Sequence, residues 1–264
     1  MHSQERWKKI LDALSDEKVT SVEYLTELLG ASPATIRRDL AELHSRGELY
    51  RVRGGVMTIN NALRRSSSSG VLVGQGSFRE SEIQHIGAKK AIGEYAISLC
   101  SPGEPIIIDG GTTTYIFAKQ LPDQHFQILT TSLPILQHLI TKPHVQILMA
   151  GGEVFREQSV ILSPYEEGIL HHFSASKIFV GAQQISAAGL MQTDPLLVKS
   201  ERHLIEHAKD VIVLVDSSKF STNASLTVCP LSRISKVITD DGIENEYRAM
   251  LEESGVEVVA VATE

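Results

Sequence analysis

The chain has 264 residues, of which 42% are hydrophobic, 22% charged and 5% aromatic. At roughly 100–200 residues per domain, this length and composition predict two folded domains and argue against general disorder. No apolar run approaches the ~20 residues of a membrane helix, and the charged residues 1–9 lack the features of a secretory signal, so we expect a cytoplasmic protein with no membrane partner.

The net charge of -7 is unevenly distributed along the chain. Residues 1–65 hold eleven Lys and Arg against nine Asp and Glu, whereas the rest holds fourteen against twenty-three. A mildly basic segment ahead of an acidic one is typical of a polyanion-binding module joined to a domain with another task. The two cysteines, Cys100 and Cys229, have neither the number nor the spacing of a disulfide scaffold or a zinc site. We expect no metal and no cofactor.

Residues 3–58 show the pattern of a winged helix-turn-helix domain. Apolar residues at helical spacing predict a first helix over 4–13, a second that opens at Thr20 or Ser21 and ends at Gly30, and a third capped by Ser32. Residues 48–57 then predict a short hairpin around a Gly-Gly turn.

Residues 59–82 lose this pattern and are rich in arginine and serine, which predicts a flexible linker. Beyond it, residues 83–264 alternate compact apolar runs with amphipathic segments. Such runs are expected of strands buried on both faces, so we predict a mostly parallel α/β domain. The runs are Pro105–Asp109, Gln127–Thr131, Val145–Ala150, Lys177–Ala182, Val211–Asp216, Lys236–Thr239 and Val256–Val261.

The third helix carries the DNA-binding signal. With Ile36, Leu40 and Leu43 facing inward, its other side presents short and basic residues near its N-terminus, where a recognition helix meets base edges. The alternative to DNA binding is an ordinary solvent-exposed helix face, on which Asp39 and Glu42 form salt bridges with the arginines. The capped second helix, the tight turn and the basic wing favour DNA. The expected DNA-binding residues are Ser32, Ala34, Thr35, Arg37, Arg38, Arg51 and Arg53.

Three loops of similar type follow predicted strands in the second domain. A Gly-rich turn with hydroxyls at a helix N-terminus suits a phosphate, and parallel sheets bind ligands at the carboxyl ends of their strands. Asp216 and Lys219 follow a later strand at the same edge, although a turn cap and a solvated charge would also explain them. The expected effector-binding residues are Asp109, Gly110, Gly111, Thr112, Thr113, Thr114, Thr130, Thr131, Ser132, Gly151, Gly152, Asp216 and Lys219.

The chain resembles the DeoR family of bacterial transcriptional regulators. In residues 5–57 the matching positions are Ser32, Thr35, Ile36, Arg37, Arg38, Asp39, Leu40, Gly54 and Gly55. From about Phe78 and Arg79 onward, Asp109–Thr113 and Asp216–Lys219 match the D-x-G-T-T and D-S-S-K segments of the family's sensor domain. One departure is Gln183-Gln184, where many members have a residue followed by glycine.

The resemblance implies a sensor domain with the fold of ribose-5-phosphate isomerase that binds phosphorylated sugars or related metabolites. It also implies a repressor of carbohydrate-catabolic genes bound to double-stranded operator DNA. We expect a homo-oligomer, dimer or tetramer, because one winged helix covers few base pairs.

The main rival is a sugar-phosphate isomerase with an attached DNA-binding head. Its catalytic groups would come from Asp109, Asp194 and Asp216, with His171, His172, His203 or His207. Those histidines have no acid at a fixed spacing, so we expect no enzyme. A protein-binding adaptor is disfavoured by the arginine pair and the basic wing.

Overall fold

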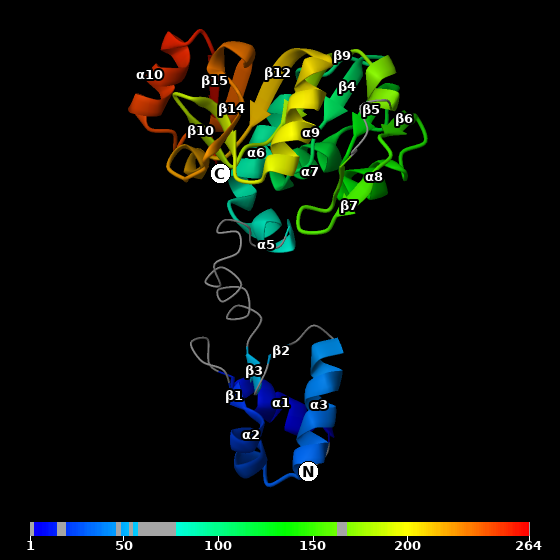
Figure 1. Cartoon of the computed structure of the whole chain (residues 1–264), viewed down its shortest axis with the longest axis vertical. Coiled ribbons are helices and arrows are strands. Elements are labelled where there is room, and N and C mark those ends of the chain that lie inside the picture. Colours follow the sequence, from blue (N-terminus) through cyan, green and yellow to red (C-terminus); the bar gives the residue numbers. More distant parts are fainter. Residues whose placement is uncertain are drawn as a thin grey trace. The chain divides into compact units, whose positions relative to one another are not determined.

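The computed structural model describes residues 3–14, 20–45, 49–52, 55–57, 78–162 and 168–263. The chain divides into two compact units, residues 1–76 and 77–264 (Figure 1). Residues 78–82, expected in the linker, form most of a short helix, α5 (Phe78–Ile83), of the second unit. None of the helices that the structure describes combines the length and apolar character that a membrane crossing requires.

The N-terminal unit is a three-helix winged domain, as predicted. Strands β2 and β3 pair antiparallel as a hairpin, and β1 adds to the other side of β3. The two-residue β1 is too short to leave a sequence pattern. The elements are α1 (Ser3–Asp12), β1 (Thr20–Ser21), α2 (Val22–Leu29), α3 (Pro33–Ser45), β2 (Tyr50–Val52) and β3 (Gly55–Met57).

Local signals set the ends of the second helix. The Ser21 hydroxyl, rather than that of Thr20, accepts a hydrogen bond from the Tyr24 N–H at 3.1 Å and caps α2. Gly30 ends the helix with φ 59°, a left-handed conformation that glycine adopts without steric cost. The chain can therefore turn sharply into α3. All three helices and the wing contribute to one core, made of Ile10, Leu25, Ile36, Leu40, Leu43, Leu49 and Val56.

The C-terminal unit is built on a seven-stranded sheet in which every pairing is parallel. The strand order is β15-β14-β12-β9-β4-β5-β6. The chain thus passes from β4 through β5 to β6 at one edge of the sheet. It then returns to the other side of β4, where β9, β12, β14 and β15 follow in order. The carboxyl ends of β4 and β9 therefore mark the switch point at which open α/β sheets bind ligands. The strands are β4 (Pro105–Ile108), β5 (Phe126–Thr130), β6 (Val145–Met149), β9 (Ala175–Val180), β12 (Ala208–Leu214), β14 (Lys236–Asp240) and β15 (Glu257–Val261).

Helices cover both faces of this sheet (Figure 1). Alternate strand residues separate the two cores: Ile106 and Ile108 pack with α6 (Ile86–Ile97), α7 (Thr112–Gln120) and α8 (Leu133–Leu139). Ile107 belongs to the opposite core, with α9 (Pro195–Glu206) and α10 (Asn245–Glu253). Burial on both faces explains why the strands read as unbroken apolar runs.

Two smaller antiparallel elements were not predicted. One is a three-stranded sheet in the order β10-β11-β13, formed by β10 (Gln184–Ser186), β11 (Gly189–Gln192) and β13 (Leu226–Cys229). The other is the hairpin of β7 (Glu153–Phe155) and β8 (Val160–Leu162). The described residues also form three short 3-10 helices: η1 (Ile169–His172), η2 (Ser217–Phe220) and η3 (Leu231–Arg233).

Candidate functional site

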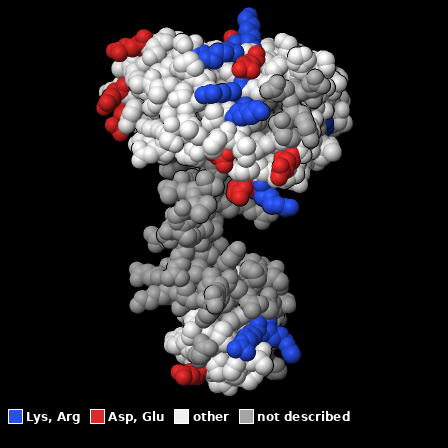
Figure 2. All heavy atoms as spheres, in the orientation of Figure 1, with Lys and Arg blue, Asp and Glu red and all other residues white. Residues whose placement is uncertain are grey.

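Helix α3 presents a basic surface near its N-terminus. Ile36, Leu40 and Leu43 are buried, whereas Ala34, Arg37 and Arg38 are exposed. Figure 2 shows blue side chains gathered on the side of the N-terminal unit where Figure 1 draws α3. Across the described part of the chain neither arginine forms an ion pair. Both guanidinium groups are therefore available to a partner.

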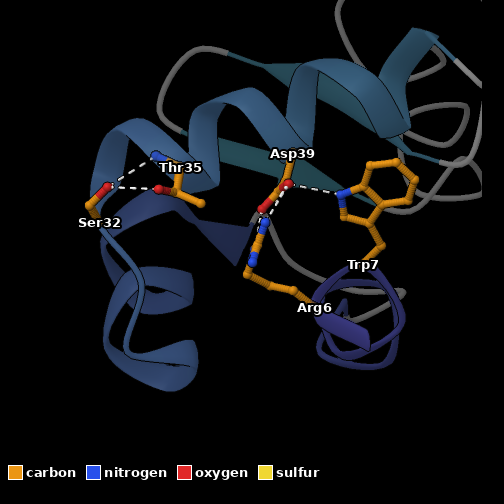
Figure 3. A network of polar contacts seen from close by, with 5 residues as sticks. All are labelled: Arg6, Trp7, Ser32, Thr35 and Asp39. Atoms are coloured by element: carbon orange, nitrogen blue, oxygen red, sulfur yellow. Dashed lines mark hydrogen bonds and ion pairs between the residues drawn. The ribbon is translucent and has the colours of Figure 1, made fainter. Parts of the chain in front are cut away.

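Ser32 and Thr35 form the N-terminal cap of α3. The Ser32 Oγ accepts a hydrogen bond from the Thr35 N–H at 3.2 Å and lies 2.9 Å from the Thr35 Oγ1 (Figure 3). This N-cap satisfies a backbone donor that the first helical turn leaves free. The pair thus fixes where α3 starts and how its exposed face is aimed.

Asp39 points away from that face and into the unit (Figure 3). Its Oδ1 accepts hydrogen bonds from Arg6 Nη2 at 3.0 Å and Trp7 Nε1 at 2.9 Å, and its Oδ2 accepts one from Arg6 Nε. Burial would raise the pKa of Asp39, but the bonds from Arg6 and Trp7 hold that pKa below its usual value. This acid therefore ties α1 to α3 instead of forming a salt bridge with Arg37 or Arg38.

The wing is described only in part. Arg51 lies on β2, and Gly55 begins β3. Arg53 and Gly54 fall outside the described residues.

The loop after β4 brings Asp109 and two glycines to the start of α7. Thr112 opens this helix, Thr113 and Thr114 are buried, and the Thr114 Oγ1 donates to the Gly111 carbonyl at 3.0 Å. Gly111 has φ 151°, which other residues rarely adopt. The turn therefore has the geometry of a helix N-terminus with local hydroxyls, as the sequence predicted.

The β7–β8 hairpin covers this loop and the next. A Cβ placed on Gly110 would lie 2.4 Å from the Val160 Cγ1. The Ile161 N–H donates to the Thr131 carbonyl at 2.8 Å, and the Leu133 N–H to the Ser159 carbonyl at 2.9 Å. Part of the expected site thus lies beneath an element that the sequence did not reveal.

The second and third loops differ in exposure. Thr130, Thr131 and Ser132 are buried, and the Ser132 Oγ has no hydrogen-bond partner among the described residues. Gly151 and Gly152 are exposed. Thr131 and Ala150 border a cavity of about 1020 Å³ whose other walls are the β7–β8 hairpin, η1 and one side of α9.

A cluster of charged side chains gathers where β12 and α6 approach each other. Asp216 caps η2 by accepting a hydrogen bond from the Ser218 N–H at 3.2 Å. Lys89, on α6, is 3% exposed, and its Nζ donates to the Ser81 carbonyl. Burial lowers the pKa of Lys89, the charge of Asp216 raises it, and that of Lys219 lowers it. The charge of Glu82 raises this pKa as well, so two lysines and two acids influence one another here, and the sequence analysis missed Lys89.

Two further buried acids were missed, Asp240 and Glu201. Asp240 ties β14 to η2, because it accepts hydrogen bonds at 2.7 Å from both the N–H and the hydroxyl of Ser217. Glu201, on the inner side of α9, interacts electrostatically with Asp109. Between described residues, no hydrogen bond or ion pair joins the β4 and β5 loops to the Lys89–Asp216–Lys219 cluster.

Gln183 and Gln184, the departure from the family pattern, hold a neighbouring loop. The Gln183 carbonyl accepts a hydrogen bond from the Thr222 hydroxyl at 2.6 Å, and the Gln184 Oε1 accepts one from the Ala224 N–H at 2.9 Å.

Among the residues considered for catalysis, Asp194 and His207 have structural partners, whereas His171 and His203 line the cavity beside α9. Asp194 caps α9 by accepting from the Leu196 N–H at 2.7 Å, and the His207 Nδ1 lies 2.8 Å from the His203 carbonyl oxygen. The His171 and His172 rings contact each other edge to face. Within the described ranges, no three His, Cys, Asp or Glu residues are placed to hold a metal ion.

Two family models match the chain. That of the DeoR-like helix-turn-helix domain matches residues 6–62, and that of the DeoR C terminal sensor domain matches residues 84–241. The chain is 30% identical to the HTH-type transcriptional regulator UlaR of Shigella sonnei (strain Ss046) and 29% identical to UlaR of Escherichia coli (strain K12 / DH10B). Each alignment spans 262 residues, 99% of this chain and 100% of the relative.

Among solved structures, ribose 5-phosphate isomerase A of Methanocaldococcus jannaschii overlaps 50% of this chain and 53% of its own, with 17% identity and a TM-score of 0.38. The eIF2B delta subunit of Chaetomium thermophilum overlaps 88% and 85%, with 15% identity and a TM-score of 0.42. Similarity at this level says nothing about catalysis.

Proposed function

Because the chain belongs to the DeoR family of DNA-binding transcriptional regulators, we propose that it represses a carbohydrate-catabolic operon until a phosphorylated sugar or related metabolite binds its C-terminal unit. It acts in the cytoplasm as a homo-oligomer, dimer or tetramer, whose paired N-terminal units contact two half-sites of double-stranded DNA.

The exposed arginine pair of α3 carries the DNA part of this proposal. Asp39, the adjacent acid, is committed to Arg6 and Trp7, so Arg37 and Arg38 keep their charge and donors for DNA. Arginine makes bidentate hydrogen bonds to guanine and also binds phosphates. Ala34 leaves room for close approach to the groove, and Arg51 and Arg53 extend the contact from the wing.

The effector part rests on the strand ends of the C-terminal unit. The helix N-terminus after Asp109–Thr114, the hydroxyls of Thr130–Ser132 and the Gly151-Gly152 turn supply donors for an anion. Lys219 neutralises the phosphate, Asp216 orients that lysine, and Lys89 adds a second positive charge.

The DNA-binding part is tested with Arg37→Ala and Arg38→Ala, singly and together. Operator DNA is titrated at fixed salt and followed by fluorescence anisotropy. Loss of a base-reading arginine costs about 1–3 kcal/mol, or roughly 5–150-fold in affinity. Lys8→Ala, an exposed cation on α1, is the matched control. If the double variant folds and binds as tightly as the parent, the DNA assignment is wrong.

The effector part is tested with Lys219→Ala and Thr113→Val, titrated with sugar phosphates. Release of DNA and formation of isomerised product are both followed. Coupling energies of about 1–3 kcal/mol correspond to roughly 5–150-fold changes in operator affinity, which the variants should lose. Lys209→Ala, an exposed cation at the amino end of β12, controls for charge. A normal response in both variants removes the proposed site, and product from the parent supports the isomerase alternative.

A further inference from the structure

The cavity of about 1020 Å³ between the β7–β8 hairpin, η1 and α9 has an apolar wall on every side. Phe155, Leu170 and Leu196 line it, one from each of these three elements. Leu196 is 60% exposed, and Val154 of the hairpin and Ile169 of η1 are exposed as well. A group of exposed apolar side chains around a hollow marks a surface that a partner covers.

The size and the walls of this cavity fit the side chains of a protein partner. Pockets for small molecules measure roughly 300–1,000 Å³, so a single phosphorylated sugar would leave much of this space empty. The hydroxyls and the phosphate of such a ligand would also gain nothing from apolar walls. Apolar side chains of a second protein surface would fill the hollow and remove its walls from water.

The charges around the cavity indicate which partner this is. Residues 66–264 hold fourteen Lys and Arg against twenty-three Asp and Glu, so two copies of the C-terminal unit repel each other over most of their surfaces. Among the described residues that line the cavity, however, the exposed acids Glu153 and Glu206 are balanced by the exposed bases Lys199 and Arg202. Figure 2 shows side chains of both signs over α9. Such a surface can face its own copy without net repulsion.

We propose that a second copy of this chain covers the cavity, and that the two copies meet about a two-fold axis through what we call the pairing surface: Val154, Phe155, Ile169, Leu196 and Lys199. A two-fold axis brings the same residues of both copies together, so each surface must be complementary to itself. Apolar contacts at the centre and charges of both signs around them meet this condition. The inference rests on the homo-oligomer of the proposed function and adds the surface through which it forms.

Leu196→Glu tests the pairing surface while leaving the fold of the chain intact. Leu196 follows the N-cap Asp194 and Pro195 in the first turn of α9, where the helix dipole favours an acidic residue. Its side chain is largely exposed in the single chain, so the variant should fold like the parent, which far-UV circular dichroism checks. Between paired copies the two new carboxylates lose water and repel each other. We expect association to weaken about 100-fold or more.

The matched control is Ile140→Glu. Ile140 is an apolar residue that is 71% exposed at the end of α8, on the opposite face of the sheet, so its substitution should leave association unchanged. A second pair of variants tests the charge balance. Lys199→Glu should weaken association, and more so at low salt, whereas Lys90→Glu, on an exposed position of α6, should not.

Analytical ultracentrifugation of the full chain over a dilution series gives the mass of each protein. The parent should reach at least twice the 28.9 kDa of one chain. Leu196→Glu should fall by one step of assembly, from a dimer to a single chain or from a tetramer to a dimer. Hydrogen exchange gives a second measurement: on dilution of the parent, protection should fall in residues 153–155 and 195–200 and stay constant in residues 133–140.

Every other outcome overturns the inference. If Leu196→Glu assembles like the parent at every concentration, the pairing surface is wrong while the proposed function stands. If Ile140→Glu dissociates as readily as Leu196→Glu, the effect is not specific to this surface and the inference is wrong. If the parent remains a single chain throughout, the inference fails together with the homo-oligomer, and the cavity is left to another protein or a small molecule. Operator titrations then test DNA binding separately.

Discussion

Asp39 is the acid that joins the first helix of the N-terminal unit to the recognition helix. Arg6 and Trp7, both on α1, donate to its two carboxylate oxygens. Its influence on DNA binding is indirect, because it fixes the helix from which Arg37 and Arg38 project.

We predict that Asp39→Ala lowers the free energy of unfolding of the N-terminal unit by about 3 kcal/mol, since it removes the acceptor that Arg6 and Trp7 share. The pKa of Asp39 is held below its usual value, so this stabilisation is present at neutral pH and lost as the pH falls through that lowered pKa. Urea unfolding followed by Trp7 fluorescence measures the change. Glu27→Ala, an exposed acid on α2, should change stability by less than about 0.5 kcal/mol. An unchanged midpoint for Asp39→Ala contradicts the assignment.

Asp109 gives the C-terminal unit the opposite dependence on pH. Its pKa is raised, so the folded state binds more protons than the unfolded state between pH ~4 and ~7, and stability falls as the pH rises through this window. We predict that Asp109→Asn flattens this slope and that Asp241→Asn, an exposed acid, leaves it in place. Urea unfolding of the full chain, followed by far-UV circular dichroism at a series of pH values, provides the comparison. The prediction is wrong if stability changes with pH by the same slope in the parent and in Asp109→Asn.

Glu201 and Lys89, two of the three missed charged residues, show which part of a buried site a sequence pattern can indicate. Glu201 is separated from the buried residues Leu197, Leu204 and Ile205 by three or four positions. Helical periodicity therefore places it on the buried side of α9. In α6, Lys89 likewise precedes the buried residues Ile92 and Gly93 by three and four positions. These positions predict an inward direction, but the neighbouring groups, Asp109 and Asp216, come from strands that only the tertiary fold brings close.

At the scale of elements, the β7–β8 hairpin is the feature that most alters the expected site. It hydrogen-bonds to the loop after β5 and packs Val160 on Gly110. Any ligand held by the first two loops lies next to this hairpin.

We predict that Gly110→Ala destabilises the C-terminal unit by about 1–3 kcal/mol, because the new Cβ would lie 2.4 Å from the Val160 Cγ1 and would push the hairpin away. Adding Val160→Ala should recover part of the loss. Gly151→Ala is the control, since no heavy atom lies within 4 Å of the Cβ it would add. Thermal unfolding by circular dichroism ranks the four proteins, and the prediction fails if Gly110→Ala melts with the parent.

Long, buried strands were predicted from the sequence, whereas short strands of the C-terminal unit were not. Strands β4, β5 and β6 are four or five residues long, mostly apolar, and were found near their observed positions. By contrast, β7, β8 and β10 are three residues each. So short a run carries too little pattern to identify, because its pairing depends on partners elsewhere in the chain. The winged domain was predicted in more detail, since Ser21, Gly30 and Ser32 mark its turns locally.

At the scale of the molecule, the charge difference between the two parts bears on assembly. Residues 1–65 carry a small excess of positive charge and the rest is acidic, with acidic side chains visible over α10 (Figure 2). The DNA backbone repels an acidic unit, so the N-terminal unit is the part of the chain suited to phosphate contacts. One such unit reads few base pairs, so a homo-oligomer that pairs two of them is the arrangement we predict.

We predict that light scattering gives a mass of at least twice the 28.9 kDa of one chain. DNA with two half-sites should bind much more tightly than DNA with one, and inserting about half a helical turn, ~5 base pairs, between them should weaken binding. A mass of 28.9 kDa both free and on DNA would rule out the homo-oligomer.

The chain has one tryptophan, Trp7, whose indole N–H donates to Asp39 of the recognition helix. With six tyrosines elsewhere in the chain, it is the tryptophan emission, excited selectively near the red edge of the absorption band, that originates from the contact between α1 and α3. A metabolite that binds the C-terminal unit alters this emission only if its effect reaches the N-terminal unit. The protein thus contains an optical probe of communication between its two parts, which can be read without attaching a dye.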